Sequence, residues 1–535
     1  MCCLLLILLW TPALAAQKFY PDDPLAVDDD RLPIAMPRER SISEVMDFLA
    51  STFTLRPKGE VDPAQNVNTL GEVPDSSWFT NRIGRHEMSL EELATGPDRA
   101  GPPDLSAPLL ITSAKTEGIT PGFFIRDARG GRYLIKFDPL RHPRLATSAE
   151  VISTKFFHAF GYFVPENYLV NLRRDDLEIG PTAEITTEQG YQRKMHPRDL
   201  EKILDQVPWL PDDTVQVLAS RLLEGAPLGP FRYHGTRRDD PNDIFPHENR
   251  RELRGLRVFA AWLNHDDSRS VNTLDTYLGN DPEGFVRHHL IDFGSTLGSG
   301  SIRPQSRRAG HEYMLEWKPM FRAAATFGIW DRPWRSVDYP HADAIGRFEG
   351  DFFSPENWKP EYPNPAFERM LPEDAFWATR IVMKFSDEMI RTVVGTGRIP
   401  DASAENHLVE SLIKRRDKLV RYFLGLVNPL WDFQVADGRL LFNNLGTEAG
   451  LASDCRYRFQ WMRFDNQTET STELAESAGI AEQAVLAISA SDSPYLMVRI
   501  WTDSAGRPEW NQPVDVYLRK TDPGYEVVGI EGQFR

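Results

Sequence analysis

The chain contains very little cysteine. Only three of its 535 residues are cysteines, and Cys2 and Cys3 both lie in a short apolar run at the N-terminus. Cys455 is then the one cysteine left in the body of the chain. A disulfide framework needs at least one pair of cysteines and a thiolate metal site needs several, so the sequence excludes both kinds of site.

The sequence also has no excess of positive charge and no long apolar run beyond its start. Its formal net charge is −17, and since nucleic acids and anionic membranes attract basic surfaces, we expect neither as the main partner. Residues 1–16, MCCLLLILLWTPALAA, are too short to span a bilayer with ease and end in a small-residue pattern typical of signal-peptide cleavage. We therefore expect an exported protein, periplasmic or extracellular, with no transmembrane segment in the mature chain.

The remaining composition, 41% hydrophobic and 26% charged, is that of an ordinary globular protein. A Pro- and Gly-rich stretch at 96–108 predicts a boundary. We expect an α+β protein divided into a signal peptide (1–16), an N-terminal extension (17–104), a strand-rich region (105–197), a largely helical region (198–430) and a β-rich C-terminal module (431–535).

Local patterns place the main elements. In the strand-rich region we expect strands at 109–112, 122–126 and 132–137, a helix at 147–160 and an extended segment at 164–172. In the helical region, apolar residues spaced by three and four predict helices at 248–263, 374–395 and 404–426. Near the N-terminus, Ser41 and Glu44 fit a capping box that would begin another helix.

The densest polar cluster, Asn264 to Asn272, directly follows the helix expected at 248–263. Two apolar strands come next, 273–278 and 285–291, separated by a turn and followed by Asp292-Phe293-Gly294. In an antiparallel hairpin centred on this turn, residue numbers that sum to about 563 face each other. Asn272 therefore faces Ile291 and lies beside Asp292, with Asp267 in the loop just before.

These side chains suit phosphoryl transfer. A carboxylate and an amide oxygen, here from Asp292 and Asn272, are hard ligands for Mg²⁺ or Mn²⁺. A second carboxylate five residues before the Asn, Asp267, can orient the attacking hydroxyl or accept its proton.

Upstream, Lys136 lies within an otherwise apolar strand and needs an anionic partner, which the phosphates of ATP would supply. The preceding segment from Lys115 to Gly122 joins two strands, and Gly118 and Gly122 would let its backbone approach a phosphate.

The pattern Asp267-x-x-x-x-Asn272, followed after a hairpin by Asp292-Phe293-Gly294, resembles the catalytic and metal-binding loops of the protein kinase-like fold. Together with Tyr133–Phe137, Ser148–Glu150 and Gly161–Pro165 it resembles the atypical branch of that fold: HipA-type toxin kinases, CotH-type spore-coat kinases and secretory-pathway casein kinases. The resemblance spans roughly residues 105–425. The sequence lacks two motifs of typical protein kinases, the His-Arg-Asp triplet and the Ala-Pro-Glu motif.

The resemblance implies a two-lobed fold, with a small β-rich N-lobe over 105–197 and a helical C-lobe over 198–430. It implies that Lys136 binds phosphate, that Glu150 pairs with Lys136 and that Asp267 is the catalytic base. Asn272 and Asp292 would be the metal ligands. The activity implied is transfer of a phosphoryl group from ATP to a hydroxyl of a protein or small molecule.

Several alternatives remain open. Thr147 and Glu150 also fit a capping box, in which Glu150 would cap its own helix instead of pairing with Lys136. Arg269 would either neutralise phosphate or hold Asp267 in place. The same site could transfer AMP, or the chain could be an inactive pseudokinase that binds partners or forms an envelope scaffold. A metal-dependent hydrolase would require ligands drawn from His265, His288 and His289.

Overall fold

The computed structural model describes residues 17–115, 121–187, 190–326, 332–340, 342–522 and 524–532. The chain is a mixed α/β protein that divides into two compact units. One contains Ala26–Val67 and Val73–Leu424; the other contains the described residues of Met1–Leu25, Asn68–Glu72 and Gly425–Arg535. The boundaries expected from the sequence near residues 104 and 197 remain predictions.

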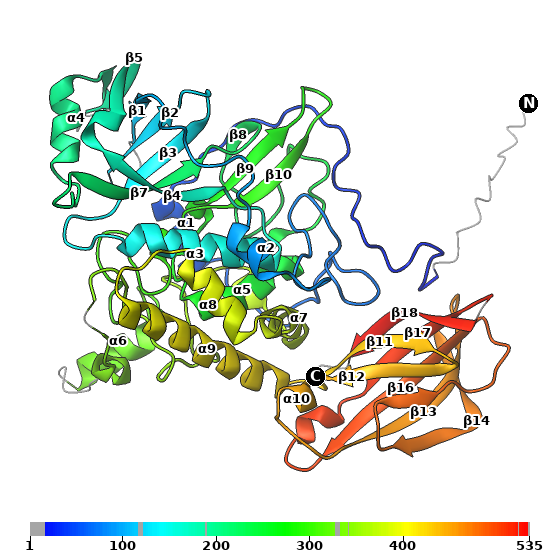
Figure 1. Cartoon of the computed structure of the whole chain (residues 1–535). Helices are drawn as coiled ribbons and strands as arrows, with labels where there is room; N and C mark the ends of the chain where they lie inside the picture. The colour runs from blue at the N-terminus through cyan, green and yellow to red at the C-terminus, as the bar shows by residue number, and fades with distance from the viewer. Residues whose placement is uncertain are drawn as a thin grey trace, which may run out of the picture. The chain divides into compact units, whose positions relative to one another are not determined.

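A seven-stranded sheet lies in the first unit, with strand order β4-β7-β3-β2-β1-β5-β6 (Figure 1). Its strands are β1 (Leu109–Ala114), β2 (Gly122–Arg126), β3 (Arg132–Phe137), β4 (Asn167–Arg173), β5 (Leu177–Thr186), β6 (Gln192–Lys194) and β7 (Thr214–Arg221). Alternate residues of the central strand β3, Tyr133, Ile135 and Phe137, are buried in one hydrophobic core. Because side chains alternate across a strand, Lys136 points to the opposite face.

Helix α3 (Leu145–Phe160) covers that opposite face (Figure 1). Its Val151 packs with Leu169 of β4 and Leu218 of β7, and Leu218 is the β-ladder partner of Lys136. Nearly every residue of α3 is buried. The helix therefore lies between the sheet and the rest of the unit.

The start of α3 differs from the capping box that the sequence suggested. The helix begins at Leu145, after Arg144 in the left-handed region (φ 69°). The Asp138 carboxylate accepts hydrogen bonds from the backbone N–H groups of Ala146 and Thr147, at 2.8 and 3.0 Å. Since a residue outside the helix supplies the cap, the interpretation of Glu150 as a cap of its own helix was wrong.

The other helices of this unit are α1 (Glu44–Phe53), α2 (Leu90–Thr95), α4 (Pro197–Leu204), α5 (Arg251–Leu263), α6 (Trp317–Ala325), α7 (Pro372–Met383), α8 (Asp387–Gly395) and α9 (Ala402–Leu424). The single helix expected at 374–395 is two helices, because Ser386 caps a new one by accepting the N–H of Met389 at 3.1 Å. Likewise α1 is capped by Ser43 and not by Ser41. No helix in the described part of the chain is long and apolar enough to cross a membrane.

A three-stranded sheet carries the hairpin, in the order β10-β9-β8, with β8 (Ala226–Gly229), β9 (Thr273–Leu278) and β10 (Phe285–Leu290). Leu278 faces Phe285 and Thr273 faces Leu290, which confirms the register expected from the turn. One step further, the Ile291 N–H donates to the carbonyl of Asn272 at 3.0 Å. The hairpin thus brings Asn272 and the chain entering Asp292 to one end.

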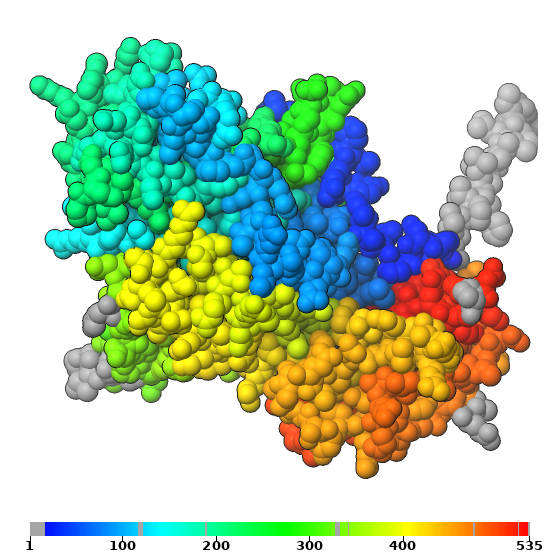
Figure 2. Space-filling model, in the orientation of Figure 1, coloured from blue at the N-terminus to red at the C-terminus, as the bar shows by residue number. Residues whose placement is uncertain are grey.

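The second unit is built from two further sheets and a short helix, α10 (Leu445–Glu448). One sheet contains β11 (Leu430–Ala436), β12 (Arg439–Asn444) and β15 (Val485–Ala487), and the other β13 (Cys455–Asp465), β14 (Thr470–Ala481), β16 (Tyr495–Ser504), β17 (Val514–Thr521) and β18 (Gly524–Gly532). Buried residues of both sheets share one core. In Figure 2 the orange and red atoms of this region form one packed body.

Candidate active site

Three charged side chains from three different elements meet beneath the seven-stranded sheet. The Lys136 ammonium on β3 lies 2.8 and 3.0 Å from the two carboxylate oxygens of Glu150 on α3. It also lies 3.0 Å from Oδ1 of Asp292, at the end of the hairpin. The structure therefore pairs Lys136 with Glu150, as the resemblance implied, and adds a contact with Asp292 that the sequence did not suggest.

These short contacts shift the pKa values of all three side chains. Burial alone would lower the pKa of Lys136, but the carboxylates of Asp292 and Glu150 outweigh burial and raise it. Burial raises the pKa of Glu150, with Lys136 opposing the shift. The nearby Lys136 charge lowers the pKa of Asp292. At neutral pH Lys136 is a fixed cation between two acidic groups, only one of which, Asp292, faces solvent with its side chain 48% exposed.

The backbone at Asp292 explains how two neighbouring side chains point in opposite directions. Asp292 adopts a left-handed conformation (φ 62°) and precedes a 3₁₀ turn, Phe293–Ser295. Phe293 is fully buried and stacks on Phe157 of α3, with ring centroids 4.6 Å apart. The carboxylate is thus directed out of the core while the next side chain anchors the loop inside it.

The loop that carries Asp267 begins at Asn264, which ends α5 in a left-handed conformation (φ 51°). His265 is buried and packs its ring against Phe157 and Phe293, 5.7 Å from each. At the other end of the loop, the Asn272 side-chain amide donates to the backbone carbonyl of Asp267 at 2.7 Å. This hydrogen bond joins the two residues, Asp267 and Asn272, whose five-residue spacing the sequence analysis noted.

Arg269 is engaged by acidic groups from three places. It forms ion pairs with Asp267 in its own loop, with Glu44 at the start of α1, and with Glu361 at 3.8 Å. Of the two roles expected from the sequence, the structure shows contact with Asp267. Helix α1 is held there by its polar side, since buried Asp47 accepts hydrogen bonds from the hydroxyls of Ser270, at 3.1 Å, and Tyr362, at 2.8 Å.

Oxygen ligands for a hard cation remain available at this site. The Asn272 amide group uses its nitrogen toward Asp267, and Asp292 uses Oδ1 toward Lys136. No described residue donates to the amide oxygen of Asn272 or to Oδ2 of Asp292. Both are the type of oxygen that Mg²⁺ or Mn²⁺ prefers, so the donor set fits such an ion.

The expected phosphate-contacting segment is described only in part. Gly118 lies outside the described residues. Lys115 follows β1. Burial raises the pKa of Glu150 and the charge of Lys115 opposes that rise, while at Asp292 Lys115 adds to the lowering of the pKa by Lys136, so a second cation lies near these two carboxylates. Gly122 opens β2, and a β-carbon there would collide with the backbone carbonyl of Ile135, so strand pairing already requires glycine at this position.

The histidines proposed for a metal hydrolase have other partners. His288 pairs with Asp275 at 2.7 Å and stacks on Trp78, and His289 binds the carbonyl of Leu274 at 3.2 Å. Within the described ranges, no group of three or more His, Cys, Asp or Glu side chains is placed to hold a metal ion.

Reasoning from sequence missed how buried and distant residues support the site, although it had noted His265 and Phe293 for other roles. His265, Phe293 and Phe157 form its buried aromatic base, and only the apolar character of the two phenylalanines signals burial. Glu44 and Asp47 come from a helix more than 200 residues before their partners Arg269 and Ser270. No local pattern could have paired them.

Comparisons with known proteins add little to these observations. No protein-family model and no curated protein matches the chain. A crystal structure of the Rio2 kinase–ADP/Mg²⁺–phosphoaspartate complex from Chaetomium thermophilum is 14% identical to it, and the similarity covers 54% of this chain and 71% of that one, with a TM-score of 0.20. A TM-score this small assigns neither a family nor an activity, so the functional argument depends on the chain's own residues.

Proposed function

We propose that the chain is an ATP- and Mg²⁺- or Mn²⁺-dependent phosphotransferase with a kinase-like catalytic region, acting on a hydroxyl of a protein or a small molecule. The observation that supports this most directly is the position of Lys136, which contacts Glu150 on a helix and Asp292 beside the hairpin. A lysine fixed in this way is a preorganised cation next to an exposed carboxylate, which suits a metal–triphosphate ligand.

Each residue has a definite task in this proposal. Asn272 and Asp292 would hold the metal ion through the oxygens that lack protein donors, and the bound ion would neutralise phosphate charge. Lys136 would contact phosphate oxygens while Glu150 keeps its ammonium in place. Lys115 and Arg269 add positive charge on either side, and Arg269 also fixes the carboxylate of Asp267.

In the transfer step, Asp267 orients the acceptor hydroxyl and accepts its proton. The hydroxyl oxygen forms a bond to the γ-phosphorus while the bond between that phosphorus and the β,γ-bridging oxygen breaks, so ADP leaves. Positioning and charge stabilisation supply the rate enhancement, because direct transfer to the acceptor hydroxyl needs no covalent intermediate on the protein.

Nucleotide binding is tested by thermal unfolding of the full chain with ATP and Mg²⁺. A ligand of the native state raises the unfolding midpoint by mass action. We expect a clear rise for the wild type, loss of that rise in Asp292→Asn, and an unchanged rise in Asp175→Asn, which alters an exposed acidic residue elsewhere in the same unit. No rise with ATP and either metal would contradict the proposal.

Catalysis is tested separately with labelled ATP and a cell-envelope extract. We expect label from the γ-position on an acceptor, and its loss in Asp267→Asn. Label from the α-position would instead identify AMP transfer, and equal labelling by wild type and Asp267→Asn would exclude Asp267 as the base. Nucleotide binding without any transfer would favour a pseudokinase.

A further inference from the structure

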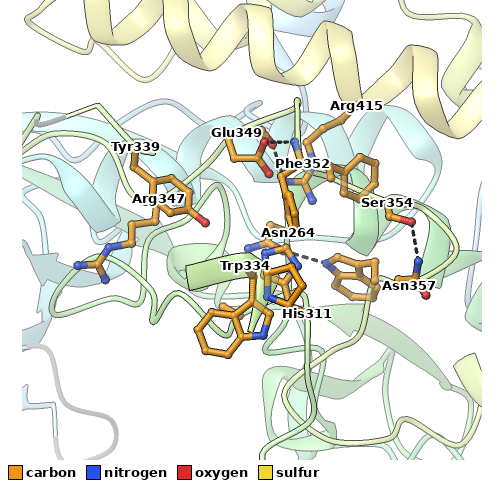
Figure 3. Close-up of a pocket in the computed structure, with 15 residues that line it drawn as sticks. Asn264, His311, Trp334, Tyr339, Arg347, Glu349, Phe352, Ser354, Asn357 and Arg415 are labelled. Carbon is orange, nitrogen blue, oxygen red and sulfur yellow. Dashed lines mark hydrogen bonds between the residues drawn. The ribbon is translucent and has the colours of Figure 1, made fainter. Parts of the chain in front are cut away.

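A cavity of about 250 Å³ lies in the first unit, which also contains the candidate active site (Figure 3). None of Lys136, Glu150 and Asp292 lines it. Its walls come mainly from the segment between the Phe293–Ser295 turn and α7. Asn264 from the end of α5 and Arg415 from α9 complete them. This volume can hold one aromatic ring with a short substituent. It is smaller than the volume of pockets that bind drug-sized ligands.

The walls are rich in aromatic side chains, which favours a planar, partly apolar ligand. The rings of His311 and Trp334 are nearly parallel, at 6°, with centroids 6.4 Å apart. Phe352 meets His311 edge-on, with centroids 5.4 Å apart. Flat ring faces of this kind bind another ring through offset or edge contacts.

Two polar groups in the lining have no hydrogen-bond partner among the described residues. Burial lowers the pKa of His311 to about 4, with the charge of Arg415 acting in the same direction, so its imidazole is neutral at pH 7. Burial raises the pKa of Tyr339, whose hydroxyl therefore keeps its proton. Neither the ring nitrogens of His311 nor the hydroxyl of Tyr339 makes a hydrogen bond to any described residue. Both can therefore bind a ligand.

Arg415 brings positive charge to the cavity. It is 4% exposed and extends from α9 toward the space beside Phe352 (Figure 3). Its guanidinium group donates to two backbone carbonyls, of Glu349 at 3.2 Å and Ala261 at 2.7 Å. Within the described part of the chain it forms no ion pair with a carboxylate, and its Nε has no acceptor.

This unpaired charge is costly without a counterion. A buried cation that has lost water is stabilised by an anion placed against it, and the rings of Phe353, 3.9 Å away, and Phe348, 4.5 Å away, compensate only in part. Arg347 is a second guanidinium in the lining, and it too donates only to backbone carbonyls. Burial lowers the pKa of Arg415 and the charge of Glu349, the carboxylate in the lining, opposes that shift, but no described carboxylate forms an ion pair with Arg415.

We propose that this cavity binds a small aromatic carboxylate, with the ring among the aromatic side chains and the carboxylate facing the guanidinium group of Arg415. The hydroxyl of Tyr339 and the imidazole of His311 hydrogen bond the ligand's polar substituents. The site is separate from the nucleotide site and does not depend on the proposed transferase activity.

A ligand in this cavity contacts a chain of hydrogen bonds that leads to the catalytic loop. The indole N–H of Trp358 donates to the side-chain oxygen of Asn264 at 2.8 Å, and the Asn264 amide donates to Gln305 at 2.7 Å. Gln305 in turn donates to the carboxylate of Asp266, the neighbour of Asp267, at 2.5 Å. Binding therefore stiffens the loop over 264–272.

The test titrates the full chain with benzoate and, as a neutral isostere, benzamide, using calorimetry and thermal unfolding. We expect benzoate to bind with a Kd of about 0.1–1 mM, a reasonable affinity for so small a ligand, and benzamide at least about tenfold more weakly. Absence of binding by benzoate, or equal binding of benzamide, would overturn the proposal.

Variants locate the binding. Arg415→Met is expected to weaken benzoate about tenfold or more, because a charged hydrogen bond is lost. Tyr339→Phe removes one hydroxyl, disturbs the fold little and is expected to weaken 4-hydroxybenzoate, whose ring hydroxyl Tyr339 would bind, about two- to tenfold. Arg421→Met, an exposed residue on the same helix, is the matched control and retains full affinity. Undiminished binding of benzoate to folded Arg415→Met, or of 4-hydroxybenzoate to Tyr339→Phe, would overturn this placement of the ligand.

Hydrogen exchange tests the connection to the catalytic loop without any need for activity. Benzoate is expected to slow amide exchange in peptides covering residues 264–272 as well as in those lining the cavity. Protection confined to the cavity would overturn this connection.

Discussion

Phe293 stacks on Phe157, with ring centroids 4.6 Å apart and ring planes inclined by 19°. Phe293 directly follows Asp292, and Phe157 lies two turns along α3 from Glu150. The two acidic residues that hold Lys136 are therefore joined through the core as well as through the lysine. His265 contacts both rings, so the loop that carries Asp267 shares the same support.

Phe293→Ala should break this support. Both phenylalanine side chains are fully buried, so removing one ring leaves a cavity and costs about 3–5 kcal/mol of unfolding free energy. We also expect the thermal shift with ATP and Mg²⁺ to shrink, whereas Phe293→Leu retains most of it. Urea unfolding and thermal shift measure the two effects. An alanine variant with the full nucleotide shift would show that the stacked rings do not position Asp292.

Lys136→Met should destabilise the fold as well as abolish nucleotide binding. It leaves Glu150, whose side chain is 3% exposed, without its cation, and such a loss costs about 3–5 kcal/mol. Combining it with Glu150→Gln should cost less than the sum of the single variants, as double-mutant analysis by urea unfolding would show. The exposed pair Lys414 and Asp351 is the control and should show weaker coupling. Strict additivity at Lys136 and Glu150 would contradict the pairing.

Local sequence patterns were enough to predict the hairpin and the face on which Lys136 lies. The turn centre alone fixes which residues face each other between β9 and β10, and alternation in Tyr133–Phe137 fixes the lysine's direction. Both features depend on neighbours in the chain, so both could be read without knowledge of the fold.

Contacts between distant segments could not be predicted in this way. Asp138 caps α3 from outside the helix, and this left Glu150 available for Lys136 although its spacing from Thr147 fits a capping box. Glu44 sits three residues after Ser41 in a similar pattern, yet it contacts Arg269, 225 residues later. In each case a tertiary partner replaced the local one.

Glu44→Gln should tighten ATP binding. Arg269 is shared among Asp267, Glu44 and Glu361, so removing the charge of Glu44 leaves more positive potential near the triphosphate. We expect Kd for ATP with Mg²⁺ to fall about two- to fivefold at low ionic strength, and the effect to shrink as salt screens the exposed charges. Glu60→Gln, an exposed change outside α1, is the control. Weaker ATP binding in Glu44→Gln would show that Glu44 instead helps to place Arg269.

Asp47→Ala should loosen α1 from the catalytic loop. The carboxylate is buried and accepts hydrogen bonds from Ser270 and Tyr362, so two hydroxyls lose their acceptor at a cost of about 2 kcal/mol. Faster amide exchange in residues 44–53 would report the loss. Val45→Ser on the exposed side of the same helix should leave exchange nearly unchanged. Equal exchange in Asp47→Ala and wild type would mean that other contacts hold the helix.

Acid should destabilise the chain through buried histidines before most carboxylates titrate. Burial, reinforced by Arg287, lowers the pKa of His289 from 6.5 to about 3. Between these values the unfolded chain binds a proton that the folded chain does not, so stability is complete above about pH 6.5 and falls as the pH drops toward 3. The slope from this histidine alone is about 1.4 kcal/mol per pH unit.

His289→Gln isolates that contribution, since glutamine can still donate to the carbonyl of Leu274 but takes up no proton. We expect the variant to lose less unfolding free energy than the wild type between pH 6.5 and 4.5, measured by urea unfolding at each pH. His86→Gln, at an exposed position, should follow the wild type. If the two variants show the same pH dependence, His289 takes up its proton over the same pH range in the folded and unfolded chain, and burial does not lower its pKa.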